Sequence, residues 1–348
     1  MLHPFVFKEI HRVSKASEQL TTSHFSFDIS HLVHDGVNEI FLSVYDPTND
    51  GSQPFGKQRV SAMYDPAGDT YAPVSGIWQS VWVESVPTRH ISALKISADT
   101  THLHLNVQTS VPDAAVVNVT VTANGKHILS GAGRANLPFS LKLPPPVRLW
   151  SPESPLLHNL SVVYGTDRVE SYFGARAVSL CKDEDGVQRP CINGRYRFLS
   201  GVLDQSYWPD GLYTAPGDAA LLSDLQAVSK RFSAGNGVRV FSSLADLVHC
   251  LQMQALGLNM IRLHQKTNPQ RYYYHADRLG MVIQQDMVQH CKRPIIDLVS
   301  ESRILAQTSP HPKLSVRRGS CRGVGGHVGL KQRHRPCQAL LRRPEADD

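Results

Sequence analysis

The spacing of apolar residues changes once along this chain, near Asn193 and Gly194, and this change constrains the fold more than any other feature. Before it, apolar and polar residues alternate in short runs, so that Leu103, Leu105 and Val107 share one side of a predicted strand. After it, short apolar runs flank a segment whose apolar residues recur every three or four positions, as on one face of a helix. The chain is therefore predicted to be multidomain, with β-sandwiches followed by an α/β unit.

Two all-β units are predicted before the change. The first covers residues 1–87, and its strands are predicted at 25–29, 38–45 and 76–86. The second covers residues 88–180, where short strands and an Asn124–Gly125 hairpin turn indicate a β-sandwich.

The order strand–helix–strand–helix–strand is predicted after the change, as at the start of a parallel sheet. The strands are predicted at 198–202, 258–263 and 281–285. The apolar face of the first helix is formed by Leu221, Leu222, Leu225 and Val228. The second helix is predicted to begin at an Asn268 cap followed by Pro269, and to end at Gly280.

Polar residues follow each of these strands: Asp204, His264 and Asp286. In a (β/α)8 barrel, this end of the sheet is where active sites are built. A complete barrel takes about 250 residues, whereas 156 residues remain from Asn193 onward. We therefore expect only the first strands of an incomplete TIM barrel.

The net positive charge of the chain lies in its C-terminal segment, and the rest of the chain is neutral overall. The formal net charge of +6 is carried entirely by residues 311–348, which hold nine Lys or Arg and three Asp or Glu, while the other 310 residues hold 27 of each sign. The tail contains no Phe, Tyr or Trp, so nucleic-acid binding ranks last among the functions considered. No apolar run approaches the roughly 20 residues of a membrane span, and no membrane partner is predicted.

The cysteines and the N-terminus indicate an intracellular setting. The six cysteines form no CxxC pair and are predicted to be reduced thiols. Residues 1–9 show no charged region before their short apolar run, so no signal peptide is predicted and a cytoplasmic location is favoured. The sequence makes no prediction of the oligomeric state.

Several motifs make the prediction specific. They are YDPTNDGSQPFGKQ at 45–58, SGIWQSVWVE at 75–84, LWSPESPLL at 149–157, GVLDQSYWPDGLY at 201–213, NMIRLHQK at 259–266 and QDM at 285–287. Together they resemble glycoside hydrolase family 2, the β-galactosidase and β-glucuronidase group, over roughly residues 25–289.

This resemblance implies four parts, truncated at both ends relative to the family. They are a partial sugar-binding jelly roll at 1–87, an immunoglobulin-like sandwich at 88–180, the N-terminal part of a TIM barrel at 181–290 and an unrelated basic, disordered tail at 291–348. Residues 231–254 interrupt the barrel part. They are either a partner-binding insertion or, as we favour, an unremoved intervening sequence in the gene model.

The resemblance implies an O-glycosyl hydrolase that acts on β-linked sugars with retention of configuration. Such enzymes need two carboxylates about 5 Å apart, and in the family both are Glu on later barrel strands. From residue 201 onward this chain holds only Glu301 and Glu345, and neither follows an Asn as the family's acid/base does. We therefore predict no catalytic residue and an inactive chain. The alternative is a noncatalytic carbohydrate-binding or scaffold protein built on the sandwiches.

The remaining polar residues predict a carbohydrate partner. Hydroxyl groups of a sugar would bond to Asp204, Asp210 and Asp286, and a sugar ring would stack on Trp208. Hydroxyls or an anionic sugar would bind Arg262, His264 and Lys266. The alternatives are a buried Asp204–Arg262 salt bridge, a Trp208 that belongs to the core, and an Asp286 that only caps a helix.

Weaker signals complete the prediction. The alternating pair His102 and His104 has no evident third ligand and is read as a solvated strand face, so no metal site or cofactor is predicted. The run at 272–274 is predicted to pack rather than to stack on sugars. In the resemblance, Asp69 and Tyr71 precede a motif that in some family members reaches into the site.

Overall fold

A computed structural model of the chain describes residues 6–7, 26–41, 44–50, 55–65, 70–205, 207–228, 258–264 and 266–286. The predicted insertion at 231–254 and the predicted tail at 291–348 lie outside these residues. Within the described ranges, no helix combines the length and the apolar character needed to cross a membrane.

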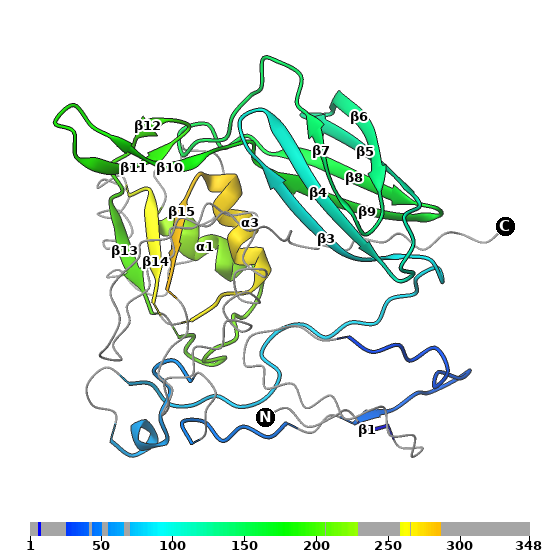
Figure 1. The fold of residues 1–348 in the computed structure, drawn as a ribbon. Coiled ribbons are helices and arrows are strands. Elements are labelled where there is room, and N and C mark those ends of the chain that lie inside the picture. Colours follow the sequence, from blue (N-terminus) through cyan, green and yellow to red (C-terminus); the bar gives the residue numbers. More distant parts are fainter. Residues whose placement is uncertain are drawn as a thin grey trace.

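The best-defined part is a two-sheet β-sandwich, seen beside the α/β unit in Figure 1. Its sheets have the orders β3-β4-β7 and β6-β5-β8-β9, with all pairs antiparallel. The first consists of β3 (Ile91–Ala98), β4 (His102–Thr109) and β7 (Pro138–Lys142). The second consists of β5 (Val116–Ala123), β6 (Lys126–Arg134), β8 (His158–Tyr164) and β9 (Asp167–Phe173).

The alternation predicted for this sandwich is confirmed. Leu103, Leu105 and Val107 of β4 and the matching valines of β5 are at most 2% exposed, and burial of each stabilises the fold by roughly 1.5–3 kcal/mol. The predicted hairpin turn also forms, with positive φ at both Asn124 (50°) and Gly125 (75°).

A small antiparallel sheet follows the sandwich. It consists of β10 (Val178–Lys182), β11 (Gln188–Ile192) and β12 (Arg195–Tyr196). Cys181 and Cys191 form a disulfide across the first hairpin, with a Cα–Cα distance of 5.9 Å. The prediction that all cysteines are reduced thiols is wrong for this pair, because the hairpin brings together two cysteines whose spacing fits no familiar motif.

The α/β unit has three parallel strands in the order β13-β14-β15, covered on one face by two helices (Figure 1). The strands are β13 (Gly201–Asp204), β14 (Met260–Leu263) and β15 (Val282–Gln285), and the helices are α1 (Asp218–Val228) and α3 (Gln270–Leu279). Leu221 and Leu225 of α1 are buried as predicted, and so are Tyr272 and Tyr273 of α3. The described strands open a parallel α/β unit, and a barrel around them stays a prediction.

Several predicted boundaries in this unit differ from the structure, among them the start of the first strand and the start of the second helix. The first strand begins at Gly201 rather than at Phe198, whose side chain is 73% exposed. The second helix begins at Gln270, with Pro269 at the cap position and no side-chain cap bond, so Asn268 is not the cap. Its predicted end holds, because Gly280 closes the helix with a φ of 74°.

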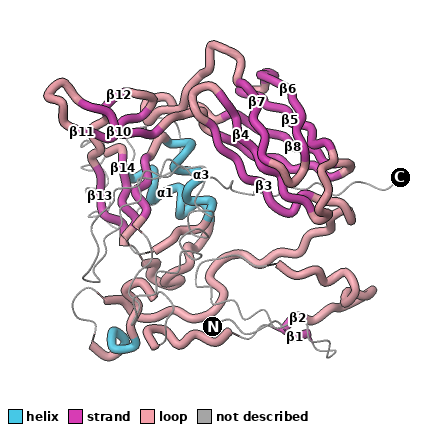
Figure 2. The backbone as a smooth tube through the Cα atoms, viewed as in Figure 1, coloured by secondary structure: helices cyan, strands magenta, loops and turns pink. Residues whose placement is uncertain are grey.

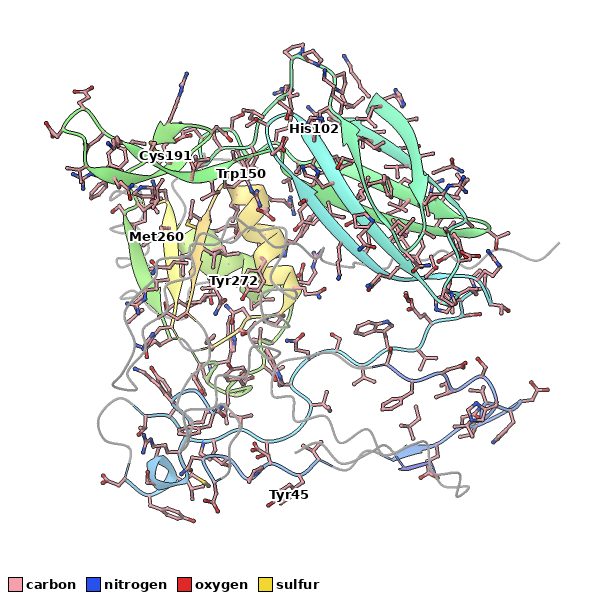
Figure 3. All side chains as sticks on the ribbon, in the orientation of Figure 1. Tyr45, His102, Trp150, Cys191, Met260 and Tyr272 are labelled. Carbon is pink, nitrogen blue, oxygen red and sulfur yellow. A yellow bond between two sulfur atoms is a disulfide. The ribbon has the colours of Figure 1, made fainter. Side chains whose placement is uncertain are left out.

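The sandwich is joined to α3 by a buried polar contact. Arg176 and Asp277 form an ion pair at 2.9 Å, with side chains 3% and 0% exposed. The hydroxyl of Tyr172 donates to the same carboxylate at 3.2 Å, and the indole of Trp150 donates to the Asp277 carbonyl at 2.7 Å. Figure 3 shows Trp150 between the small sheet and α3. All four residues of this contact take part in hydrogen bonds, so the contact fixes the position of α3 relative to the sandwich.

The N-terminal part departs from its prediction. Residues 26–29 and 76–86 form no strand. Among the described residues of the predicted strand at 38–45, Ile40–Phe41 form β2, which pairs with β1 (Val6–Phe7). The other element is a short 3-10 helix, η1 (Val60–Met63), and Figure 2 shows loop over most of this part. Alternation identifies the face that a strand would bury, but a strand also needs a hydrogen-bonded neighbour, and the described residues supply none to 76–86. A jelly roll at 1–87 therefore stays a prediction.

Candidate functional site

The predicted site residues divide between the two faces of the parallel sheet. In the strand register, Leu203 lies opposite Arg262, whereas Asp204 lies opposite Leu263. Leu263 is fully buried against the two helices, so Arg262, one position earlier, faces the other side. We call this other side the open face. The amino-terminal end of this face packs on Trp150 and Ile192, while at its carboxyl-terminal end Leu203 is 50% exposed.

Three predicted residues meet on the open face, and we call them the Arg–His–Asp cluster: Arg262, His264 and Asp286. The Nε and Nη2 atoms of Arg262 donate to Oδ2 of Asp286 at 3.0 and 2.6 Å. The Nδ1 atom of His264 lies 2.6 Å from the same oxygen. The side chains are 26%, 18% and 9% exposed in the order Arg, His and Asp. The cluster is thus rigidly bonded yet open on one side.

Buried Gln285 stabilises this cluster from the helix-covered face of the sheet. Its Nε2 donates to the carbonyls of Lys266 and Asp286 at 2.8 and 2.7 Å, and its Oε1 accepts from the Tyr273 hydroxyl at 2.6 Å. The side chain therefore ties the segment after β14 to the end of β15 and to α3. Gln285 was not predicted as a site residue, and its place directly before Asp286 is the only sequence signal for it.

Two other predicted residues, Asp204 and Lys266, lie on the helix-covered face. The Tyr272 hydroxyl donates to Asp204 at 3.4 Å. Burial lowers the pKa of Lys266, while the nearby carboxylates of Asp204 and Asp224 oppose that shift. We call Asp204, Asp224, Lys266 and Tyr272 the helix-side cluster. The alternative of an Asp204–Arg262 salt bridge is wrong, because Arg262 pairs with Asp286 across the sheet.

Asp224 of α1 has the most displaced carboxyl pKa in this cluster. Neighbouring protein atoms desolvate the Asp224 carboxyl, and the charge of Asp204 lies nearby; together they raise the pKa of Asp224 from 3.8 to about 6. Asp224 is itself an exposed residue of α1, so solvent screens part of this interaction.

The last two predicted site residues do not join either cluster. Trp208 is partly buried against the apolar core under the sheet, as the alternative reading predicted. Asp210 is exposed, and its carboxylate accepts from the neighbouring Gly211 N–H at 2.9 Å. A sugar-stacking role for Trp208 and a hydroxyl-binding role for Asp210 stay predictions.

An aromatic contact links the N-terminal part to the loop after β13. The Tyr71 hydroxyl donates to Gln205 at 3.0 Å, and the Tyr71 ring stacks on Tyr207 with centroids 4.7 Å apart. Trp78 meets Tyr213 edge to face at 4.8 Å. Burial raises the pKa of both Tyr207 and Tyr213. Of these residues only Tyr71 was singled out from the sequence, and Asp69 lies outside the described residues.

The histidine pair on β4 belongs to the sandwich surface. The rings of His102 and His104 lie 6.0 Å apart, and His104 contacts Asp99 at 3.1 Å and Ser140 at 2.7 Å. Within the part of the chain that the structure describes, no group of three His, Cys, Asp or Glu side chains is arranged to hold a metal ion.

Comparison with known proteins gives likenesses in fold alone. No protein-family model and no curated protein match the sequence. The chain is similar to Bacteroides uniformis β-glucuronidase 2 at 19% identity and a TM-score of 0.46, covering 67% of this chain and 28% of that one. It is also similar to B. uniformis β-glucuronidase 3, at 18% identity and a TM-score of 0.43 over 58% and 23% of the two chains. A GH2 β-galacturonidase from Eisenbergiella tayi shows 16% identity and a TM-score of 0.42 over 58% and 33%. The chain spans about a quarter to a third of the length of these three structures.

Proposed function

We propose that this chain binds a β-linked sugar at the Arg–His–Asp cluster and does not hydrolyse it. The observation that carries the proposal is the meeting of Arg262, His264 and Asp286 at the carboxyl ends of two parallel strands. That edge is where parallel α/β proteins place their ligands.

The chemistry of the cluster suits a polyhydroxylated ligand. A guanidinium donates hydrogen bonds in a fixed fork, and an imidazole offers one donor and one acceptor nitrogen. Here the Arg262 and His264 side chains are held in place by one carboxylate, so little rotamer freedom remains to be lost when a ligand binds. The resemblance of residues 201–213 and 259–266 to glycoside hydrolase family 2 supports a β-glycoside as that ligand.

The absence of hydrolysis is proposed on the placement of the carboxylates. A retaining glycosidase needs two carboxyl groups about 5 Å apart that flank one glycosidic bond. Asp286 lies on the open face, whereas Asp204 lies on the helix-covered face beside Tyr272. The two cannot flank the same bond, and Asp286 is already bonded to both Arg262 and His264.

The proposal is tested with the purified full chain. We expect calorimetry to detect binding of methyl β-glycosides, and we expect no release of phenol from aryl β-glycosides. Arg262→Met should abolish the binding heat, whereas Arg168→Met, which removes an exposed Arg from the sandwich strand β9, should leave it unchanged. Hydrolysis that is lost in His264→Ala would overturn the noncatalytic part. Binding that survives Arg262→Met would overturn the site.

A further inference from the structure

We infer that Ser140, on the surface of the β-sandwich, is an activated nucleophile that accepts an acyl group from an ester. This inference goes beyond the proposed sugar binding and concerns a different part of the molecule. It rests on a chain of hydrogen bonds in which Ser140 contacts His104 and His104 contacts Asp99. A hydroxyl, an imidazole and a carboxylate bonded in this order form the arrangement by which many hydrolases activate a serine.

The antiparallel sheet brings these three side chains together. Ser140 of β7 lies directly opposite His104 of β4, and its Oγ is 2.7 Å from His104 Nδ1. Asp99 lies in the turn between β3 and β4, and its Oδ2 is 3.1 Å from His104 Nε2. Ser140 is exposed and the His104 side chain is 43% exposed, so an ester in solution reaches the hydroxyl.

The turn holds the Asp99 carboxylate in place and keeps it ionised. Its Oδ1 accepts from the backbone N–H groups of Thr101 and His102 at 2.6 and 2.8 Å, and from the Thr101 hydroxyl at 2.8 Å. Neighbouring protein atoms desolvate the carboxylate and oppose its ionisation, but the hydrogen bonds that it accepts outweigh this and hold the pKa of Asp99 well below its ordinary value. The second oxygen, Oδ2, is therefore a fixed and charged acceptor for His104.

The charge of Asp99 determines which imidazole nitrogen serves as the base. A carboxylate only accepts hydrogen bonds, so its contact with His104 Nε2 uses a proton on that nitrogen in both charge states of the ring. In the neutral ring this is the only proton, and Nδ1 accepts the hydroxyl proton of Ser140. In the protonated ring Nδ1 donates to Ser140 instead. The serine is therefore activated only when the ring is neutral.

The reaction needs an ester as its only co-reactant. The Ser140 Oγ atom forms a bond to the carbonyl carbon while its proton passes to His104 Nδ1. The bond between the carbonyl carbon and the leaving oxygen then breaks, and the leaving alcohol takes that proton, which leaves an acyl-serine. Because the site is open to water, electrostatic stabilisation of the transition state is weaker than in a buried site. We therefore assign it to esters with a good leaving group, such as aryl esters.

The same sandwich contains a second serine–histidine contact that lacks the carboxylate. The Oγ atom of Ser130 lies 2.9 Å from His127 Nε2 on strand β6, and both residues are exposed. Among the described residues, no carboxylate contacts the His127 ring. A comparison of Ser140 with Ser130 in one molecule therefore isolates the contribution of Asp99.

The experiment labels the purified full chain with a fluorophosphonate probe, in which the oxygen of an activated serine replaces fluoride, and maps the labelled peptides by mass spectrometry. We expect Ser140 to react about tenfold or more faster than Ser130. An aryl acetate should place an acetyl group on Ser140 with the same preference. Equal labelling of the two serines, or labelling of neither, would overturn the inference and leave the proposed sugar binding untouched.

Two variants separate activation of Ser140 from simple exposure. In Asp99→Asn, Oδ1 still accepts the bonds of the turn, while the amide donates to His104 Nε2 and leaves the imidazole proton on Nδ1. Ser140 then has no base, so its labelling rate should fall about tenfold, as it should in His104→Gln. Asp185→Asn, in the exposed turn between β10 and β11, should leave the rate unchanged. A rate that survives both site variants would overturn the inference.

The pH dependence gives an independent measurement. Since only the neutral ring of His104 activates Ser140, the labelling rate at Ser140 should rise with pH between about pH 5 and 8 more steeply than the rate at Ser130. The titratable and charged groups on this side of the sheet and in its turn are Asp99, Lys95, His102 and Lys142. A rate at Ser140 that is independent of pH over this range would contradict the role of His104 as the base.

Discussion

Two Arg–Asp pairs in this molecule have the same chemistry and opposite settings. Arg176–Asp277 is 3% and 0% exposed, and its carboxylate also accepts from Tyr172. Arg262–Asp286 is 26% and 9% exposed, and it leaves one guanidinium nitrogen without a bonded partner among the described residues. The first pair joins two parts of the fold, whereas the second can still bond to a ligand. The number of unused donor and acceptor atoms, rather than the ion pair itself, therefore separates a structural contact from a candidate site.

Of these variants, one that breaks the buried Arg176–Asp277 pair should lower the free energy of unfolding most. Asp277→Asn leaves the Arg176 charge buried without its partner, and we expect a loss of about 3–5 kcal/mol in the free energy of unfolding, measured by urea denaturation. The double variant Arg176→Met with Asp277→Leu should recover most of this loss, because a well-packed apolar pair often replaces a buried ion pair at little cost. A double variant as unstable as the single one would show that the charges themselves are required.

Tyr273→Phe tests whether the Arg262–Asp286 pair depends on the buried side chain of Gln285. The variant leaves Oε1 of the fully buried Gln285 without its donor, which should cost about 1–3 kcal/mol of stability and weaken sugar binding. Tyr274→Phe is the matched control, since no hydrogen bond of its hydroxyl is found among the described residues. Equal effects of the two variants would contradict a role for the Tyr273–Gln285 bond.

The open pair should matter less for stability than for binding. In Asp286→Asn, water can reach the exposed side of Arg262, so we expect the free energy of unfolding to fall by about 1 kcal/mol or less. The same variant should weaken sugar binding, because Arg262 and His264 lose the carboxylate that holds them in place. A stability loss as large as that of Asp277→Asn would erase the contrast between the two pairs.

The smallest effect is expected on the pH dependence of stability. The folded-state pKa of Asp224 is raised from 3.8 to about 6, so between these values the folded chain binds more protons than the unfolded chain. Its contribution to stability is complete below pH 3.8 and is lost as the pH rises toward 6. Asp224→Asn should flatten the stability curve across this window and stabilise the chain above it. Denaturation on both sides of the window, with Asp185→Asn as control, measures this.

The sequence predicted the sandwich well because its two determinants are local. Alternation placed Leu103, Leu105 and Val107 inside, and the Asn124–Gly125 pair set a tight turn. Each of these signals lies within a few residues of the structure that it specifies. The helix end at Gly280 was predicted for the same reason.

The division of the candidate site between two faces could not be read from the sequence. Asp204, His264 and Asp286 each follow a strand, but the face on which each side chain lies depends on register and on the true start of β13 at Gly201. With the first strand predicted at 198–202, Asp204 falls outside it. The sequence pattern therefore does not predict that the Asp204 side chain lies beside Tyr272. The Cys181–Cys191 disulfide was missed because it depends on a hairpin partner rather than on a spacing motif.

The turn at Gly280 has a consequence for the candidate site. A Cβ atom added at this residue would collide with the carbonyl of Pro152, which belongs to the segment joining the sandwich strands β7 and β8. Gly280 thus ends α3, lies two residues before the start of β15, and contacts the segment that belongs to the sandwich. Since β15 has four residues, a displacement of the sandwich at Pro152 should also displace Asp286, which follows this strand. We therefore expect the sandwich and the α/β unit to move together rather than independently.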